Sequence, residues 1–221
     1  MKCEGFGCIE KTDDGTEVLG CDTVYAVSKE HFSKNWASIE NAQELLNVFN
    51  LYELPEAVDI VLTGGEPLIY ANDPIFIKFL EVLVENGHNI TFETNGSLNV
   101  DFDEYPVYRE CFFALSVKLS NSHEPLSKRV RGDTIYNIAS NAKDAFFKFS
   151  IDAESINLGL EEELSEILQH SPKTKVYCMP LGGNKEEVEL NTEPLIEFCK
   201  VKGYNFSDRL HIRIWDINKG V

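Results

Sequence analysis

The chain has 221 residues, 43% of them hydrophobic, which is enough for one globular domain with a sizeable core. Its formal net charge of −17 disfavours direct nucleic-acid binding, because most of the surface would repel phosphates. The sequence has neither an apolar run long enough to span a bilayer nor an apolar signal core, so we expect a cytoplasmic protein without membrane contact.

The six cysteines form two groups. Cys3, Cys8 and Cys21 crowd the amino-terminal segment with the spacing Cys-x4-Cys-x12-Cys. Three thiolates on a glycine-containing loop can hold three irons of a [4Fe–4S] cluster and leave the fourth iron open for an amino-acid ligand. From the spacing alone, a zinc site completed by His31 and thiols that bind no metal remain alternatives. The other three cysteines sit singly in apolar runs and are interpreted as buried thiols: Cys111, Cys178 and Cys199.

From about Ser38 onward, short apolar runs alternate with amphipathic helical patterns. The runs predict strands over residues 58–63, 89–94, 111–117, 145–151, 174–179 and 210–215. The patterns predict helices over residues 39–52, 73–87, 135–142, 160–170 and 194–202. In the second of these, Asp73 is the expected N-cap, Pro74 the first helical residue and Gly87 the stop.

This alternation predicts parallel β-α units in a single α/β domain, as an open partial barrel or a doubly wound sheet. Residues 1–37 would form a cluster-binding loop region, and residues 38–221 the β/α core with a C-terminal segment. In both folds, ligands bind at the carboxyl ends of the strands. Four unusual motifs follow predicted strands there: Thr63-Gly64-Gly65-Glu66-Pro67, Glu93-Thr94-Asn95-Gly96, Ser116-Val117-Lys118 and Met179-Pro180-Leu181-Gly182-Gly183.

Two of these motifs have a direct chemical reading. Gly64 and Gly65 allow a ligand to approach the backbone closely, and Glu66 supplies an acceptor beside them. Glu93, Thr94 and Asn95 offer groups suited to a ribose or an amino acid, although an Asn-Gly turn alone would be weak support.

Taken together, the three cysteines, the Gly-Gly-Glu-Pro motif and the Glu-Thr-Asn-Gly motif resemble those of radical S-adenosylmethionine enzymes. More narrowly, the chain resembles the family of 7-carboxy-7-deazaguanine synthases. The narrower resemblance rests on the short chain and on three segments: Cys21-Asp22-Thr23, Met179-Pro180 and the closing Leu210-His211-Ile212-Arg213-Ile214-Trp215.

The resemblance implies a role for each motif. Cys3, Cys8 and Cys21 would hold the [4Fe–4S] cluster, and Thr23 would bind Mg²⁺, a cation that prefers oxygen. Thr63, His211 and the carboxylate of Val221 would contact substrate. The S-adenosylmethionine pocket would comprise Gly20, Cys21, Asp22, Gly64, Gly65, Glu66, Glu93, Thr94, Asn95, Ser116, Val117, Lys118, Met179, Pro180, Leu181 and Gly182.

The implied reaction is a ring contraction. A 5′-deoxyadenosyl radical made from S-adenosylmethionine would abstract hydrogen from 6-carboxy-5,6,7,8-tetrahydropterin, and rearrangement with loss of ammonia would give 7-carboxy-7-deazaguanine, a precursor of queuosine-type nucleosides. The expected partners are the pterin, a reductase or flavodoxin-type electron donor and a second copy in a homodimer. The alternatives are another radical enzyme, such as a glycyl-radical activase, and a non-catalytic zinc-stabilised binding protein.

The chain departs from the family pattern before its first cysteine. It opens at Met1-Lys2-Cys3, without the strand, the pterin-binding Gly-Glu-Gly loop and the arginine of the family. We therefore expect a barrel that lacks its first strand and binds the pterin weakly.

Several other residues have an ordinary structural reading that competes with a functional one. Lys148 could point into the site or lie at its mouth, and His123 with residues 129–131 could meet a substrate carboxylate or form a solvated loop. His211 could be a core histidine, Trp215 is expected to serve packing, and acidic runs such as residues 161–163 are expected to be solvated.

Overall fold

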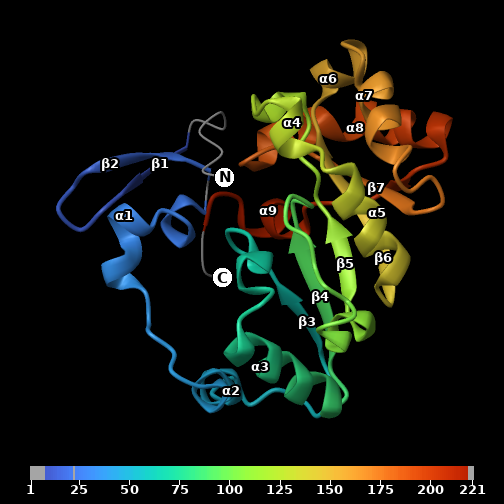
Figure 1. The fold of residues 1–221 in the computed structure, drawn as a ribbon. Helices are drawn as coiled ribbons and strands as arrows, with labels where there is room; N and C mark the ends of the chain where they lie inside the picture. Colours follow the sequence, from blue (N-terminus) through green and yellow to red (C-terminus); the bar gives the residue numbers. More distant parts are fainter. Residues whose placement is uncertain (1–7, 22, 219–221) are drawn as a thin grey trace.

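A six-stranded parallel sheet forms the centre of the computed structural model, which describes residues 8–21 and 23–218. The strands follow one another across the sheet in chain order, so the chain never reverses direction as a doubly wound sheet requires. This confirms the predicted open partial α/β barrel (Figure 1). The strands are β3 Asp59–Leu62, β4 Asn89–Thr94, β5 Phe112–Leu115, β6 Asp144–Ile151, β7 Lys175–Pro180 and β8 Asn205–Phe206.

The amino-terminal region forms a hairpin instead of the expected loop, from β1 Cys8–Lys11 and β2 Glu17–Gly20. The hairpin and α1 lie apart from the sheet, and an extended segment connects α1 to α2 (Figure 1). Helices α5, α7 and α8 lie along the sheet. Within the described residues, no helix is both long and apolar enough to cross a membrane. The α-helices are α1 Lys29–Phe32, α2 Ala42–Asn50, α3 Pro74–Glu85, α4 Leu126–Arg129, α5 Gly132–Asn141, α6 Ala153–Asn157, α7 Leu160–Leu168, α8 Lys185–Lys202 and α9 Leu210–Trp215.

Short 3₁₀ turns punctuate the connections: η2 Val24–Ala26, η3 Ser33–Asn35, η4 Pro67–Tyr70, η5 Pro106–Glu110 and η6 Ser120–Ser122. Helix α3 has the predicted boundaries, because Asp73 accepts hydrogen bonds from the backbone N–H groups of Ile75 (2.8 Å) and Phe76 (3.2 Å). Gly87 follows its end with a φ of +83°.

The two faces of the sheet differ in burial. One face carries the core, in which Phe92 and Phe113 stack with ring centroids 5.1 Å apart. Side chains alternate along a strand, so the residues between these core positions face the opposite side. There Glu93, Lys148 and Met179 are half-buried. We call this side the open face, and its carboxyl end is where the predicted motifs lie.

The strand predicted near the C-terminal end of the described chain is a helix. Residues 210–215, predicted as the last strand, form α9, and the sheet ends instead with the two-residue β8. Ile212 is buried, but Ile214 is 51% exposed, so the alternation of apolar and polar residues does not mark a strand with one covered face. Helix α8 also differs from expectation, because it begins at Lys185 and contains Pro194 in its interior.

Candidate functional site

The amino-terminal hairpin brings two of the predicted cluster ligands together. In its antiparallel register Cys8 lies opposite Gly20, and Cys21 follows Gly20 directly. Both thiols are half-buried, and the Cys21 Sγ lies 3.2 Å from the Thr23 hydroxyl oxygen. Two thiols and a hydroxyl therefore share the open end of one hairpin.

The two thiols fit an iron–sulfur cluster, and zinc, which also favours thiolate ligands, stays an alternative. Soft thiolates suit iron–sulfur clusters, and partial exposure leaves room beside them. Among the described residues, no group of three or more His, Cys, Asp or Glu side chains could hold a metal ion. His31 has its Nδ1 2.9 Å from the Ser28 hydroxyl, and the other predicted ligand, Cys3, lies outside the described residues, as does Asp22.

The diglycine turn packs against the segment that follows Cys21. Gly65 has a φ of +60°, and a Cβ built on it would lie 2.7 Å from the Cγ1 of Val27. Gly64 has a φ of +85°, but a Cβ there would meet nothing within 4 Å. A glycine is thus needed at position 64 only for the left-handed backbone conformation. Gly65 is needed for this conformation and also for the close contact with the segment that follows Cys21.

Glu66 connects this turn to the end of β4. Its Oε1 accepts hydrogen bonds from the Leu68 backbone N–H (3.2 Å) and the Thr94 hydroxyl (2.7 Å). Its Oε2 accepts one from the backbone N–H of Asn95, at 2.8 Å. Glu66 is 8% exposed and Thr94 1% exposed, so both groups hold the turn in place, and their contacts with a cofactor stay predictions.

A second polar chain crosses the open face. The exposed Thr63 donates a hydrogen bond to the Glu93 Oε2 (3.3 Å), and Lys148 pairs with the Glu93 Oε1 (2.5 Å). Lys148 therefore lies beside a predicted site residue, Glu93, and a functional role of this lysine stays a prediction.

The Ser116–Lys118 segment follows β5 and is held from two sides. Its Ser116 backbone N–H donates to the Thr94 carbonyl oxygen at 2.7 Å. Arg129 donates to the Lys118 carbonyl oxygen at 3.1 Å and pairs with Glu163, which accepts from the Ser120 backbone and hydroxyl. Side-chain exposures of 8% and 14% show that the predictions of a solvated loop at Arg129 and a solvated face at Glu163 were wrong.

The Met179–Gly182 segment lies at the end of β7. Leu181 donates its backbone N–H to the Ile151 carbonyl oxygen at 2.8 Å, and its own carbonyl oxygen accepts from Asn191 at 2.7 Å. Asn191 also accepts from the Ala153 backbone N–H, at 2.8 Å. This buried asparagine was missed because a polar residue inside a helix gives no sequence signal of its own.

Two of the three predicted substrate residues, Thr63 and His211, lie in the described part of the chain. His211 is exposed on α9, which packs against α8, so the core interpretation of this histidine was wrong. The carboxylate of Val221 lies outside the described residues. Thr63 lies beside another predicted site residue, Glu93, and contact of His211 with substrate stays a prediction.

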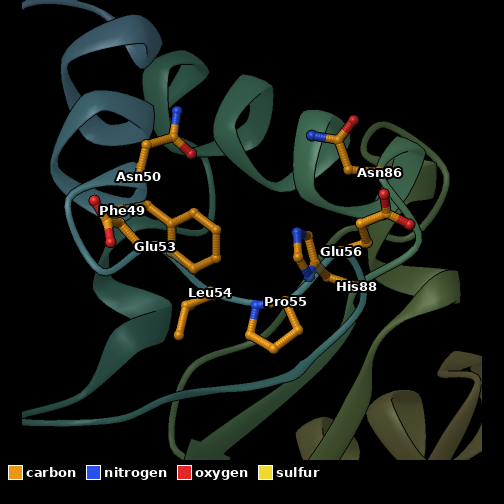
Figure 2. A pocket seen from close by; sticks show the side chains of 8 residues that line it. All are labelled: Phe49, Asn50, Glu53, Leu54, Pro55, Glu56, Asn86 and His88. Atoms are coloured by element: carbon orange, nitrogen blue, oxygen red, sulfur yellow. The ribbon is translucent and has the colours of Figure 1, made fainter.

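A cavity of about 480 Å³ lies at the other end of the sheet, where β3 and β4 begin (Figure 2). Phe49 and His88 line it in an edge-to-face contact with each other, their ring centroids 5.4 Å apart. The lining residues are Phe49, Asn50, Glu53, Leu54, Pro55, Glu56, Asn86 and His88, and none belongs to a strand-end motif. This cavity is therefore separate from the candidate site.

The cysteines should differ in reactivity. Burial raises the pKa of Cys111 from 9.0 to about 12 and also raises that of Cys178, and neither side chain is exposed. We expect iodoacetamide at pH 8 to modify Cys8 and Cys21 in the metal-free folded protein and to leave Cys111 and Cys178 unmodified, because the thiolate is the reactive form. Peptide mass spectrometry measures the labelling, with denatured protein as the control.

The raised pKa also has a consequence for stability. Between about pH 9 and pH 12, Cys111 ionises in the unfolded chain but not in the folded one, so its contribution to stability is lost as the pH rises. Rapid labelling of Cys111 at pH 8 without unfolding would contradict this description of the core.

Comparison with known proteins places the chain in a family. The profile of the 4Fe-4S single cluster domain family matches residues 18–139, more than half of the chain. The 7-carboxy-7-deazaguanine synthase of Rhodopirellula baltica is 26% identical over 211 residues, which cover 90% of this chain and 75% of that protein. The enzyme of the same name from Halobacterium salinarum is 26% identical over 176 residues, 71% of this chain and 65% of its own length.

Solved structures show the same fold. Streptococcus suis SuiB superimposes with a TM-score of 0.51 at 12% identity, over 78% of this chain and 44% of SuiB. The structure of SuiB bound to S-adenosylmethionine gives a TM-score of 0.50 at 11% identity. Sequence, hairpin, strand-end turns and fold agree, and the chain belongs to the 4Fe-4S single cluster domain family as a radical S-adenosylmethionine enzyme.

Proposed function

We propose that this protein is a 7-carboxy-7-deazaguanine synthase that contracts the ring of 6-carboxy-5,6,7,8-tetrahydropterin with loss of ammonia. The supporting observation is the similarity to the Rhodopirellula baltica synthase, which extends over 90% of this chain. A shared cluster motif alone would be local, whereas this similarity includes the strand ends from which the open face is built.

Each part of the candidate site would have a distinct task. Cys8 and Cys21, with Cys3, would hold the [4Fe–4S] cluster. Gly65 would bring the strand-end turn against the cysteine segment, and Glu66 would keep that turn rigid. When bound, the cluster and S-adenosylmethionine supply the radical chemistry, while the protein orients the reactants and excludes water.

Further elements of the proposal concern metal and partners. The Thr23 hydroxyl would bind Mg²⁺ beside the cluster, since this cation prefers oxygen ligands and usually retains several from water or substrate. A flavodoxin-type protein or a reductase would deliver electrons, the enzyme would act as a homodimer, and the product would enter 7-deazapurine synthesis of the queuosine type.

The proposal is tested by product analysis. Protein reconstituted anaerobically with iron and sulfide is incubated with S-adenosylmethionine, dithionite, Mg²⁺ and the tetrahydropterin. We expect mass spectrometry to detect 7-carboxy-7-deazaguanine, and removal of Mg²⁺ with a chelator to slow its formation. Release of 5′-deoxyadenosine without this product would contradict the synthase assignment, and an unchanged rate without Mg²⁺ would contradict the role of Thr23.

A matched pair of cysteine variants controls this assay. Cys21→Ala removes a proposed cluster ligand, so product formation should be lost. Cys199→Ala removes a buried thiol on α8 that serves packing, so activity should be retained. Equal loss of activity in both variants would indicate a general folding defect instead of a specific role of the hairpin.

A further inference from the structure

One ion pair crosses the open face of the sheet. Glu93 on β4 and Lys148 on β6 lie on strands that are not neighbours, because β5 runs between them. Ala114 of β5 stands beside Glu93 in the register and is 1% exposed. Its small side chain leaves space for Lys148 to reach over β5, and the Lys148 Nζ lies 2.5 Å from the Glu93 Oε1.

The pair is accessible from the open side. Its side chains are 22% exposed for Lys148 and 32% for Glu93, so neither charge is sealed in the core. The Thr63 hydroxyl donates a hydrogen bond to the second carboxylate oxygen of Glu93. Within the described part of the chain, Lys148 donates one side-chain hydrogen bond, to Glu93, and an ammonium carries three N–H groups. Two donors of Lys148 can therefore serve a bound ligand.

A lysine at the carboxyl end of the open face is unusual in a chain with a net charge of −17. Among the strand residues of β3 to β7 that share the open face, the other lysine, Lys175, lies at the opposite end, where β7 begins. A ligand carboxylate near Glu93 would be repelled unless a cation neutralised that side chain. Lys148 supplies this neutralisation and the donors together.

We propose that Lys148 binds the carboxylate of a heterocyclic substrate and gives the open face its preference for the carboxylated ligand. The identification of the heterocycle as a pterin rests on the proposed function. Glu93 holds the ammonium at the carboxyl end of the sheet, and Thr63 fixes Glu93 in turn. The ligand carboxylate then lies beside Lys148 without displacing the ion pair.

Binding of two stable fluorescent probes tests this assignment. 6-Carboxypterin carries the carboxylate, and 6-hydroxymethylpterin has the same ring system without it. Both are titrated into reconstituted protein that contains S-adenosylmethionine. Lys148→Met should weaken binding of 6-carboxypterin by about 10- to 100-fold, the loss expected for a hydrogen bond to a charged group, and should leave binding of 6-hydroxymethylpterin little changed.

Three further variants sharpen the result. Lys148→Arg retains the charge and should recover part of the affinity for the carboxylate. Lys78→Met removes a lysine that pairs with Glu81 on the exposed side of α3, so it should change neither affinity. The double variant Lys148→Met with Glu93→Gln leaves no unpaired charge at this position, so it can be measured even if Lys148→Met alone folds poorly. The double variant should also lose the preference for 6-carboxypterin.

The outcomes separate this inference from the proposed function. Three results for Lys148→Met would overturn the proposed role of Lys148. These are equal weakening of the binding of both pterins, unchanged binding of 6-carboxypterin, and a loss of affinity for S-adenosylmethionine instead of for 6-carboxypterin. Failure of the unaltered protein to bind 6-carboxypterin would overturn it as well. Lys148-dependent binding of 6-carboxypterin without turnover of the tetrahydropterin would support the inference and reject the synthase assignment.

Discussion

Replacing Gly65 with alanine is expected to weaken S-adenosylmethionine binding by at least about tenfold and to lower stability, because the new Cβ would overlap the Val27 side chain at 2.7 Å. The left-handed backbone adds strain of roughly 1–2 kcal/mol for any residue with a Cβ. Since Val27 belongs to the segment that follows Cys21, relief of the overlap would move the diglycine turn away from the proposed cluster.

Gly64→Ala provides the matched control. Gly64 has a similar left-handed conformation, with a φ of +85°, but a Cβ there meets no atom within 4 Å. Its loss of stability should be confined to the backbone strain, and cofactor affinity should fall less than in Gly65→Ala. Equilibrium dialysis with reconstituted protein measures the affinity. Equal effects of the two substitutions would show that the Gly65–Val27 contact does not position the turn.

Replacing Glu66 with alanine should lower the free energy of unfolding by about 3–5 kcal/mol, a large part of the stability of a typical domain. The carboxylate accepts three hydrogen bonds, from Leu68, Thr94 and Asn95. Its removal leaves these donors without a partner in a region that water reaches poorly, and each buried donor left unsatisfied costs about 1–3 kcal/mol. Urea unfolding of the metal-free protein measures the change.

Two related variants show how much of this loss of stability comes from a single hydrogen bond and how much from the carboxylate group. Thr94→Val removes one of the three donors and should cost less than Glu66→Ala. Glu66→Gln keeps the shape, but its amide group would point N–H donors at an N–H or O–H donor of the protein, so it should be destabilising as well. A loss below about 1 kcal/mol for Glu66→Ala, the scale of an ordinary surface substitution, would show that the network does not hold the turn.

The parallel α/β fold could be predicted because its signal is local. Each strand is a short apolar run, and α3 carries its own N-cap, Asp73, and its own stop, Gly87. The buried state of Cys111 could be predicted for the same reason, since it lies within an apolar run. Position in chain order also placed the strand-end motifs at one edge of the sheet.

The C-terminal helix could not be predicted from the same signal. In residues 210–215 the apolar and polar side chains alternate as they do in a strand, yet the segment is fixed as α9 by contacts with α8. Arg213 donates to the Thr192 hydroxyl at 2.6 Å and to Asp208 at 2.6 Å. These tertiary contacts override the local pattern, because propensity is a weak preference that context readily reverses.

The ion pairs of the site depend on strand order and register, which one sequence does not reveal. Lys148 meets Glu93 across an intervening strand, and Arg129 meets Glu163 from a different helix. Glu163 sits in an acidic run that is typical of a solvated helix face, so nothing local distinguishes it from its neighbours. The hairpin pairing of Cys8 with Gly20 is likewise a matter of register.

We propose that thiols of the amino-terminal hairpin hold a cluster with one iron open to S-adenosylmethionine beside the diglycine turn. Electron paramagnetic resonance of the reduced, reconstituted protein tests it most directly. We expect a [4Fe–4S]⁺ signal that changes when S-adenosylmethionine is added and is absent in Cys21→Ala. A protein that takes up no iron, or a cluster signal that S-adenosylmethionine leaves unaltered, would rule out this arrangement of the cluster.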